Sequence, residues 1–254
     1  MRCSGRLGRL AAGVAAAVVL AGISAGTAAA SPVTSRAPAT PEATSTSPIA
    51  SGYAATPKGG GATSFTSVQD TFTVPRLNCA STPNGTAQMR AGLGPIISSM
   101  YAQVGLSETC TNGVASYVTW YAYYPVTVNS FSPEPGDALS SSVSYSVGTY
   151  TLSMQDLTSG QSFSIQQKCT STCPNASAEV TAGSAKGTTP ADFTVVNFAA
   201  ITVTGNTGGS GGLSNANWAT NTYVQSGTPH TVAGTLLTST TAPAQSAFQD
   251  TWVS

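Results

Sequence analysis

Short runs in which apolar and polar residues alternate, each ended by Gly, Pro, Asn or Ser, fill this chain beyond residue 51. Between residues 143 and 154, for example, Val, Tyr, Leu and Met alternate with Ser and Thr on both sides of Gly148-Thr149. This period of two is typical of a β-hairpin, and no segment after the first 30 residues sustains the 3.6-residue period of an amphipathic helix. The regular spacing of such runs predicts one all-β domain over residues 51–254, either a sandwich or a barrel.

The first 30 residues have the layout of a secretory signal peptide. Three arginines lie within the first nine residues, an Ala- and Gly-rich apolar stretch follows, and the segment Thr27–Ala30 supplies an A-x-A cleavage site. A membrane anchor is the alternative, but the apolar stretch is shorter than the roughly 20 residues that a spanning helix needs. We therefore expect signal cleavage after Ala30, secretion to the extracellular space and no retention in a membrane.

Residues 31–50 consist almost entirely of Pro, Ala, Ser and Thr, with little that a core can bury. This composition is typical of a linker or of a short propeptide.

Charged residues make up only 7% of the chain, and its formal net charge is zero. No basic surface can be assembled from so few cations, so we do not expect nucleic acid as a partner. The chain contains one histidine, His230. An HExxH zinc site needs two histidines, and any Ser-His-Asp or Cys-His triad would depend on His230 alone. The composition therefore argues against the most common hydrolase sites.

Four cysteines lie beyond the signal segment: Cys79, Cys110, Cys169 and Cys173. An even number of cysteines in a secreted chain predicts two disulfides, for which three pairings are possible. We favour Cys79–Cys110 and Cys169–Cys173, because Pro174 and the Ser and Thr between the last two cysteines favour a tight loop. A zinc site made of four thiolates is the alternative, but the sequence has no CxxC pair.

Three local motifs follow one another within the β-rich region. Residues 117–125 read Tyr-Val-Thr-Trp-Tyr-Ala-Tyr-Tyr-Pro, residues 135–137 read Pro-Gly-Asp before a strand, and residues 156–161 read Asp-Leu-Thr-Ser-Gly-Gln in a hairpin turn. The order of these motifs resembles that of the eqolisins, the glutamic endopeptidases. Residues 65–68 and 71–75 match the opening strands of that family, and the resemblance extends from about residue 50 to the C-terminus. The resemblance implies an antiparallel β-sandwich of the concanavalin-like jelly-roll type.

The resemblance also implies a catalytic pair. Gln103, within Tyr101–Gly105, occupies the place of the family's catalytic glutamine, and Glu179, within Ser177–Val180, occupies that of its glutamate. A carboxylate can take a proton from the water that attacks the scissile carbonyl, and a side-chain amide can stabilise the oxyanion that forms. Because glutamine does not ionise, such a site holds a single carboxyl group.

A member of this family is expected to be a secreted endopeptidase that works on polypeptides at acidic pH, without a metal or an organic cofactor; we also expect a monomer. The aromatic residues Tyr117, Trp120, Tyr121 and Tyr123 are expected to contribute to substrate binding. Since both faces of their strand carry rings, we expect one face to be buried and the other to line a cleft.

Several positions depart from the family pattern. Arg90 stands in place of a tryptophan, Gly94 in place of an aspartate, Ala122 in place of an acidic residue, and Val180 in place of the tryptophan after the glutamate. These differences leave two other interpretations open. One is an inactive concanavalin-like module that binds carbohydrate or a surface, and the other is a surface protein whose Ser- and Thr-rich exterior resists proteolysis.

The orientation of the candidate pair separates these interpretations. If the side chains of Gln103 and Glu179 converge on one concave face beside the aromatic strand, the peptidase interpretation is favoured. If they lie on opposite faces, it fails.

Overall fold

The computed structural model describes residues 43–61, 63–95, 102–123, 126–169, 172–173, 175–207, 209–234, 237–238 and 246–254. Within these ranges the regular structure is β-strand, apart from the three-residue 3-10 helix η1 (Lys58–Gly60). In the same ranges, no helix has the length and hydropathy that crossing a bilayer requires. The predicted signal segment, residues 1–30, lies outside the described residues.

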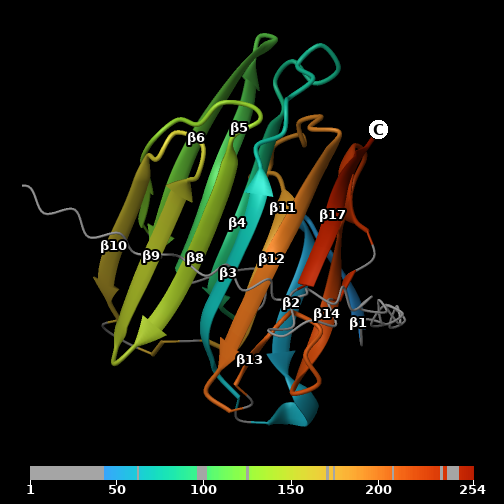
Figure 1. Ribbon diagram of the computed structural model, residues 1–254. Coiled ribbons are helices and arrows are strands. Elements are labelled where there is room, and N and C mark those ends of the chain that lie inside the picture. Colours follow the sequence, from blue (N-terminus) through green and yellow to red (C-terminus); the bar gives the residue numbers. More distant parts are fainter. Residues whose placement is uncertain are drawn as a thin grey trace, which may run out of the picture. The chain divides into compact units, whose positions relative to one another are not determined.

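The strands form the two layers of a β-sandwich (Figure 1). In one layer, called the site sheet below, the strand order is β1 (Ala43–Ser47), β14 (Trp218–Gln225), β2 (Ala50–Pro57), β11 (Ser177–Gly183), β4 (Thr86–Gly94), β5 (Ala102–Thr111), β6 (Val114–Tyr123) and β7 (Val126–Asn129). In the other, the opposite sheet, the order is β10 (Ser162–Lys168), β9 (Thr149–Asp156), β8 (Ala138–Ser146), β3 (Phe65–Thr73), β12 (Val195–Gly205) and β17 (Ser246–Val253). Short strands extend this sheet: β13 (Ser210–Gly211) pairs with β12, and β15 (His230–Ala233) and β16 (Leu237–Thr238) pair with β17. Strand β15 also pairs with β14 of the site sheet, so hydrogen bonds join the two layers at this edge.

The hydrophobic core lies between the two sheets. Alternate residues of the site sheet, such as Met89, Val104 and Val180, are fully buried there. Tyr53 of β2 meets Phe248 of β17 across the interface, with ring centroids 5.0 Å apart in an edge-on arrangement. Burying one face of each strand produces the period-two pattern of the sequence. The predicted antiparallel β-sandwich is confirmed, with the parallel pair β1–β14 as an exception.

Two tight turns lie where the sequence predicts them. Strands β8 and β9 form the hairpin around Gly148, and the turn residues Val147 and Gly148 have φ values of 46° and 74°. Positive φ at both central residues matches the twist of a two-residue hairpin loop. In the β9–β10 turn, the Asp156 carboxylate accepts hydrogen bonds from the backbone N–H of Thr158 (2.8 Å) and of Ser159 (3.0 Å).

The segment predicted as a linker, residues 31–50, ends inside the sheet. Its last described residues form β1, which pairs with β14 in parallel, and they lead directly into β2. The Ser47 side chain is 1% exposed, and its hydroxyl accepts hydrogen bonds from the backbone N–H groups of Ile49 and Ala50. A polar edge strand needs backbone partners more than apolar side chains, so composition alone did not reveal it.

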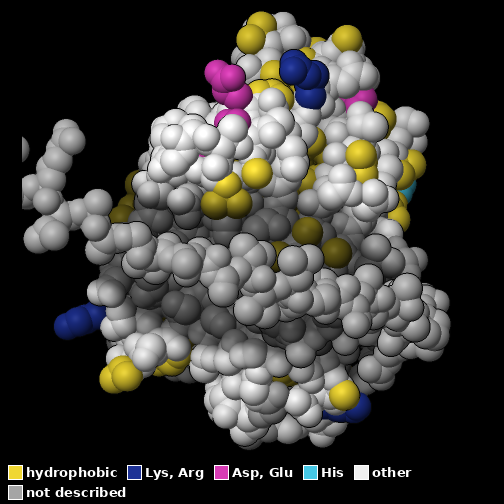
Figure 2. All heavy atoms as spheres, viewed as in Figure 1, with side chains coloured by type: hydrophobic (Ala, Val, Ile, Leu, Met, Phe, Trp, Pro, Cys, Tyr) yellow, Lys and Arg dark blue, Asp and Glu magenta, His cyan; other side chains and the backbone are white. Residues whose placement is uncertain are grey.

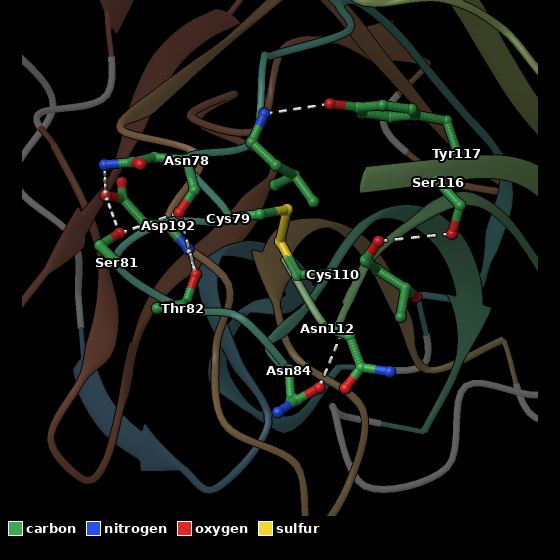
Figure 3. The surroundings of a disulfide bond; sticks show 12 residues. Asn78, Cys79, Ser81, Thr82, Asn84, Cys110, Asn112, Ser116, Tyr117 and Asp192 are labelled. Carbon is green, nitrogen blue, oxygen red and sulfur yellow. Dashed lines mark hydrogen bonds between the residues drawn. A yellow bond between two sulfur atoms is a disulfide. The ribbon is translucent and has the colours of Figure 1, made fainter. Parts of the chain in front are cut away.

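Both predicted disulfides are confirmed. Cys79–Cys110 joins the loop after β3 to the end of β5, with a Cα–Cα distance of 5.5 Å, and Cys169–Cys173 closes a short loop after β10. Near the first disulfide, the Asp192 carboxylate accepts hydrogen bonds from the Asn78 amide and the Ser81 hydroxyl, so the loop is held at several points (Figure 3).

Hydroxyl and amide side chains cover the outer face of the opposite sheet. The β3–β8 register aligns Ser67 with Ser144 and Gln69 with Ser142, and β9 continues these rows. Among the described atoms that Figure 2 shows, only a few belong to Lys or Arg side chains (dark blue) or to Asp or Glu side chains (magenta).

Candidate active site

One glycine connects the two predicted catalytic side chains. Strand β4 lies between β5 and β11, and Gly92 of β4 is the register partner of both Gln103 on β5 and Glu179 on β11. Residues directly opposite each other in neighbouring strands point to the same face of a sheet. Gln103 and Glu179 therefore share the outer face of the site sheet, two strand spacings or about 10 Å apart at their backbones. Because Gly92 has no side chain, none from β4 stands between them at this level.

Small residues continue the same row on both sides. Ala122 of β6 is the partner of Gln103, and Ala54 of β2 is the partner of Glu179. These five residues, Ala122, Gln103, Gly92, Glu179 and Ala54, are called the Gly92 row below. Two long polar side chains thus stand on a strip of sheet that is otherwise glycine and alanine.

The next row of the same face contains Trp120 of β6. The register runs from Trp120 to Gly105, then to Arg90 and to Thr181. A Cβ atom on Gly105 would lie 2.5 Å from the Trp120 ring, so the glycine leaves room for the indole to lie over β5. The ring is 4% exposed, although it is not part of the main core between the sheets.

The aromatic strand divides its rings between two faces. Tyr121 and Tyr123 alternate with Trp120 and point into the sandwich, where Tyr121 packs against Phe163 (5.4 Å between ring centroids) and Tyr123 against Tyr150 (5.8 Å). Of the four aromatic residues predicted to bind substrate, Trp120 alone lies on the face that holds Gln103 and Glu179.

Tyr117 also alternates away from Trp120 and packs against the core. Its hydroxyl oxygen accepts a hydrogen bond from the backbone N–H of Leu77 (3.0 Å), beside the Cys79–Cys110 disulfide (Figure 3). This contact ties the end of β6 to the disulfide loop.

The Glu179 side chain is fully buried and has a hydroxyl neighbour on its own strand. Ser177 precedes it by two residues, so both side chains point to the same face. The Ser177 hydroxyl lies 2.5 Å from Glu179 Oε1 and 2.8 Å from the backbone carbonyl oxygen of Gly94. Both residues are 0% exposed.

A positive charge also acts on Glu179. Burial lowers the pKa of Arg90 to about 10, while the attraction between the guanidinium and Glu179 opposes that shift. The attraction is mutual, so Arg90 favours the ionised form of the Glu179 carboxyl. The guanidinium is 7% exposed and donates a hydrogen bond to the Ile49 carbonyl oxygen (3.2 Å).

Tyr223 of β14 faces the same region. Burial raises the pKa of its hydroxyl, and the nearby Glu179 raises it further. Tyr223 is therefore neutral throughout the acidic and neutral range, where it can only donate or accept a hydrogen bond.

Gln103 is half-buried, and its carbonyl oxygen Oε1 is buried without a hydrogen-bond partner among the described residues. A buried polar atom without a protein partner is commonly satisfied by water or by a ligand. The face thus combines an ionisable carboxyl with an amide that can bind a polar group. Among the described residues, no group of three or more His, Cys, Asp or Glu could hold a metal ion.

The sequence alone did not identify Ser177, Gly92 and Tyr223 as parts of this site. The spacing of Ser177 from Glu179 was a usable signal, because residues two apart on a strand share a face. Gly92 and Tyr223 offered no such signal, since their places depend on how distant strands pair.

Comparison with known proteins points to one family. The sequence matches the model of the Peptidase A4 family over residues 49–252. No curated protein matches the sequence.

The solved structures that share the fold include two peptidases. One is scytalido-glutamic peptidase with a peptide-based transition-state analogue, with a TM-score of 0.59 and 18% identity over 84% of this chain and 100% of that chain. The other is SCP-B, a member of the eqolisin family, in a complex with the tripeptide Ala-Ile-His, with a TM-score of 0.58 and 17% identity over the same shares of the two chains.

Proposed function

Because the chain belongs to the Peptidase A4 family, the eqolisins or glutamic-type endopeptidases, we propose that it hydrolyses polypeptides at acidic pH with Glu179 and Gln103 as its catalytic pair. The observation that carries this assignment is the shared register of both residues with Gly92. It gives the two side chains a common face with no side chain between them. The buried setting of Glu179, beside a hydroxyl and a cation, is also typical of a carboxyl with a chemical role.

In the first step, the ionised Glu179 carboxylate acts as general base. It takes a proton from water while the water oxygen bonds to the scissile carbonyl carbon and the carbonyl oxygen becomes an oxyanion. The Gln103 amide donates a hydrogen bond to that oxygen as the charge develops. Glu179 is then the neutral acid.

In the second step, the tetrahedral intermediate collapses. The C–N bond breaks as Glu179 transfers its proton to the departing nitrogen, and the carboxylate is regenerated. One water molecule is consumed, and the single proton held by Glu179 is returned, so no second ionisable group is required.

We also propose that the enzyme is secreted and acts outside the cell. The two disulfides fit an oxidising compartment, and the first 30 residues have the layout of an export signal.

The test is cleavage of an unfolded protein by purified enzyme across the acidic and neutral pH range. The parent should cleave at acidic pH, and Glu179→Gln should fold but lose nearly all turnover, because the amide cannot act as a base. Gln103→Ala should lose about 10²–10³ in rate, the usual effect of removing one oxyanion donor. Glu134→Gln makes the same chemical change at an exposed carboxyl and should behave as the parent.

Equal cleavage by the parent and by Glu179→Gln would show that the pair is wrongly assigned. A folded parent that cleaves nothing at any pH would favour the inactive binding module instead. His230→Ala should retain full activity, since the mechanism uses no imidazole.

A further inference from the structure

Ser177 has one hydroxyl proton and two neighbouring oxygens. Its Oγ atom lies 2.5 Å from Glu179 Oε1 and 2.8 Å from the Gly94 carbonyl oxygen. A serine hydroxyl can donate one hydrogen bond and can accept up to two, whereas a backbone carbonyl only accepts. The hydroxyl can therefore donate to only one of these two oxygens at a time.

The choice depends on the protonation of Glu179. When the carboxyl is ionised, Ser177 can donate to Oε1, and a hydrogen bond to a charged acceptor is stronger than one to a neutral acceptor. When a proton rests on Oε1, the carboxyl can donate to Oγ while Ser177 turns its own proton to Gly94. The same contact is thus compatible with both states of the acid.

We propose that Ser177 is a positioning residue that holds the Glu179 carboxyl in place and stabilises its ionised form during turnover. The inference rests on the proposed function, in which Glu179 must be a base in one step and an acid in the next. Full burial disfavours the charged state, and the serine offsets part of that penalty by a direct hydrogen bond.

Other groups around Glu179 are of different kinds. Among the described residues, Arg90 from β4 and Tyr223 from β14 are ionisable groups that interact with it, whereas Gln103 of β5 and Ala54 of β2, in the same row of the sheet, do not ionise. Among these, Arg90 acts through its charge and Tyr223 remains neutral below its raised pKa. Ser177 makes a short contact with one defined oxygen of the carboxyl, Oε1.

The experiment measures kcat/KM against pH. Ser177→Ala should move the acidic limb of the profile to higher pH by about one unit, because the hydrogen bond lost from the ionised carboxyl is stronger than the one lost from the neutral carboxyl. Ser177→Thr and Ser177→Val form a pair of equal bulk that differs in the hydroxyl. The threonine variant should restore the parent profile, and the valine variant should shift like alanine.

Thr181→Val is the matched control. Thr181 lies two residues after Glu179 on the same face, and its hydroxyl is buried without a hydrogen-bond partner among the described residues. Its removal should leave the acidic limb in place. If Ser177→Ala and Ser177→Val lower thermal stability or rate without moving the limb, the hydroxyl only links β11 to Gly94 and the proposal is overturned.

A second measurement does not depend on activity. The chain has four glutamates, Glu42, Glu108, Glu134 and Glu179, so ¹³C labelling of the glutamate carboxyls yields few resonances, and Glu179→Gln identifies the one of interest. The pKa of Glu179 should be higher in Ser177→Ala than in the parent. Failure of the proposed function would appear as absent cleavage, whereas an unchanged Glu179 pKa would overturn the role of Ser177 alone.

Discussion

Arg90 is a residue whose side chain changes the chemistry of the face around it. It stands where the eqolisin pattern has a tryptophan, and it brings a buried cation within electrostatic reach of Glu179. The Arg90 guanidinium donates a hydrogen bond to the Ile49 carbonyl oxygen, and its charge interacts electrostatically with Glu179. A cation near a general base keeps that base ionised at lower pH.

Arg90→Gln removes this charge and should shift the acidic limb of the activity profile upward by about 0.5–1 pH unit. Arg90→Lys keeps the charge and should preserve the limb. Lys186→Gln, which removes an exposed cation elsewhere, provides the control. The kcat/KM profile checks this prediction, and an identical limb in Arg90→Gln and the parent would contradict it.

At the scale of elements, the close approach of β4, β5 and β6 depends on one glycine, Gly105 of β5. A Cβ atom at Gly105 would lie 2.5 Å from the Trp120 ring and 2.6 Å from the Met89 carbonyl oxygen. Distances under 3.0 Å require something to shift, and the backbone carbonyl is held in the sheet. The glycine on β5 therefore fixes where the indole lies beside the Gly92 row.

Gly105→Ala should accordingly lower the free energy of unfolding by about 1–3 kcal/mol, the usual cost of overpacking. Denaturant unfolding at a fixed acidic pH measures it. Ser107→Ala, two residues further along the same face of β5, should stay within about 0.5 kcal/mol of the parent. A Gly105→Ala protein as stable as the parent would mean that the ring moves aside without cost.

The two disulfides differ in the length of chain that they close. Cys79–Cys110 spans 31 residues and Cys169–Cys173 spans 4. In the chain-entropy model, replacing the first pair by serines should cost about 3–4 kcal/mol and replacing the second about 2 kcal/mol. Urea unfolding of the two double variants tests the order, and a larger loss from the shorter loop would contradict the model.

At the scale of the whole molecule, charged residues are few, and several carboxyl side chains are buried between the sheets. Burial raises the pKa of Asp70 to about 7, against a hydrogen bond from Ser141, and raises the pKa of Asp250 to about 7, against one from Ser51. Burial also raises the pKa of Glu108 well above its ordinary value. In the folded protein these groups hold protons that the unfolded chain releases near pH 4.

The sign of the pH dependence follows from this difference. Between about pH 4 and pH 7 the folded state binds more protons than the unfolded state, so stability is greatest at acidic pH and falls as the pH rises. The melting temperature should therefore be higher near pH 4 than near pH 8. Asp70→Asn should flatten the decline, because its amide does not ionise; an equally steep decline in this variant would exclude Asp70 as a cause.

The local pattern of the sequence was sufficient for the type of element and for the candidate residues. Alternation around Gly148 predicts a hairpin because a strand exposes alternate residues to opposite faces. Cysteine spacing predicts both disulfides, and short motifs single out Gln103 and Glu179. All of these depend on residues close together in the chain or on a recurring arrangement of motifs.

Only the tertiary structure decided which side chains share a face. Period two separates Trp120 from Tyr121 and Tyr123, but it does not say which of the two sets faces the core. The meeting of Gln103 and Glu179 depends on β4 pairing with both β5 and β11, which joins positions 76 residues apart through Gly92. Strand register is set by long-range backbone hydrogen bonds and by packing between sheets, and neither is encoded in the local alternation of residues.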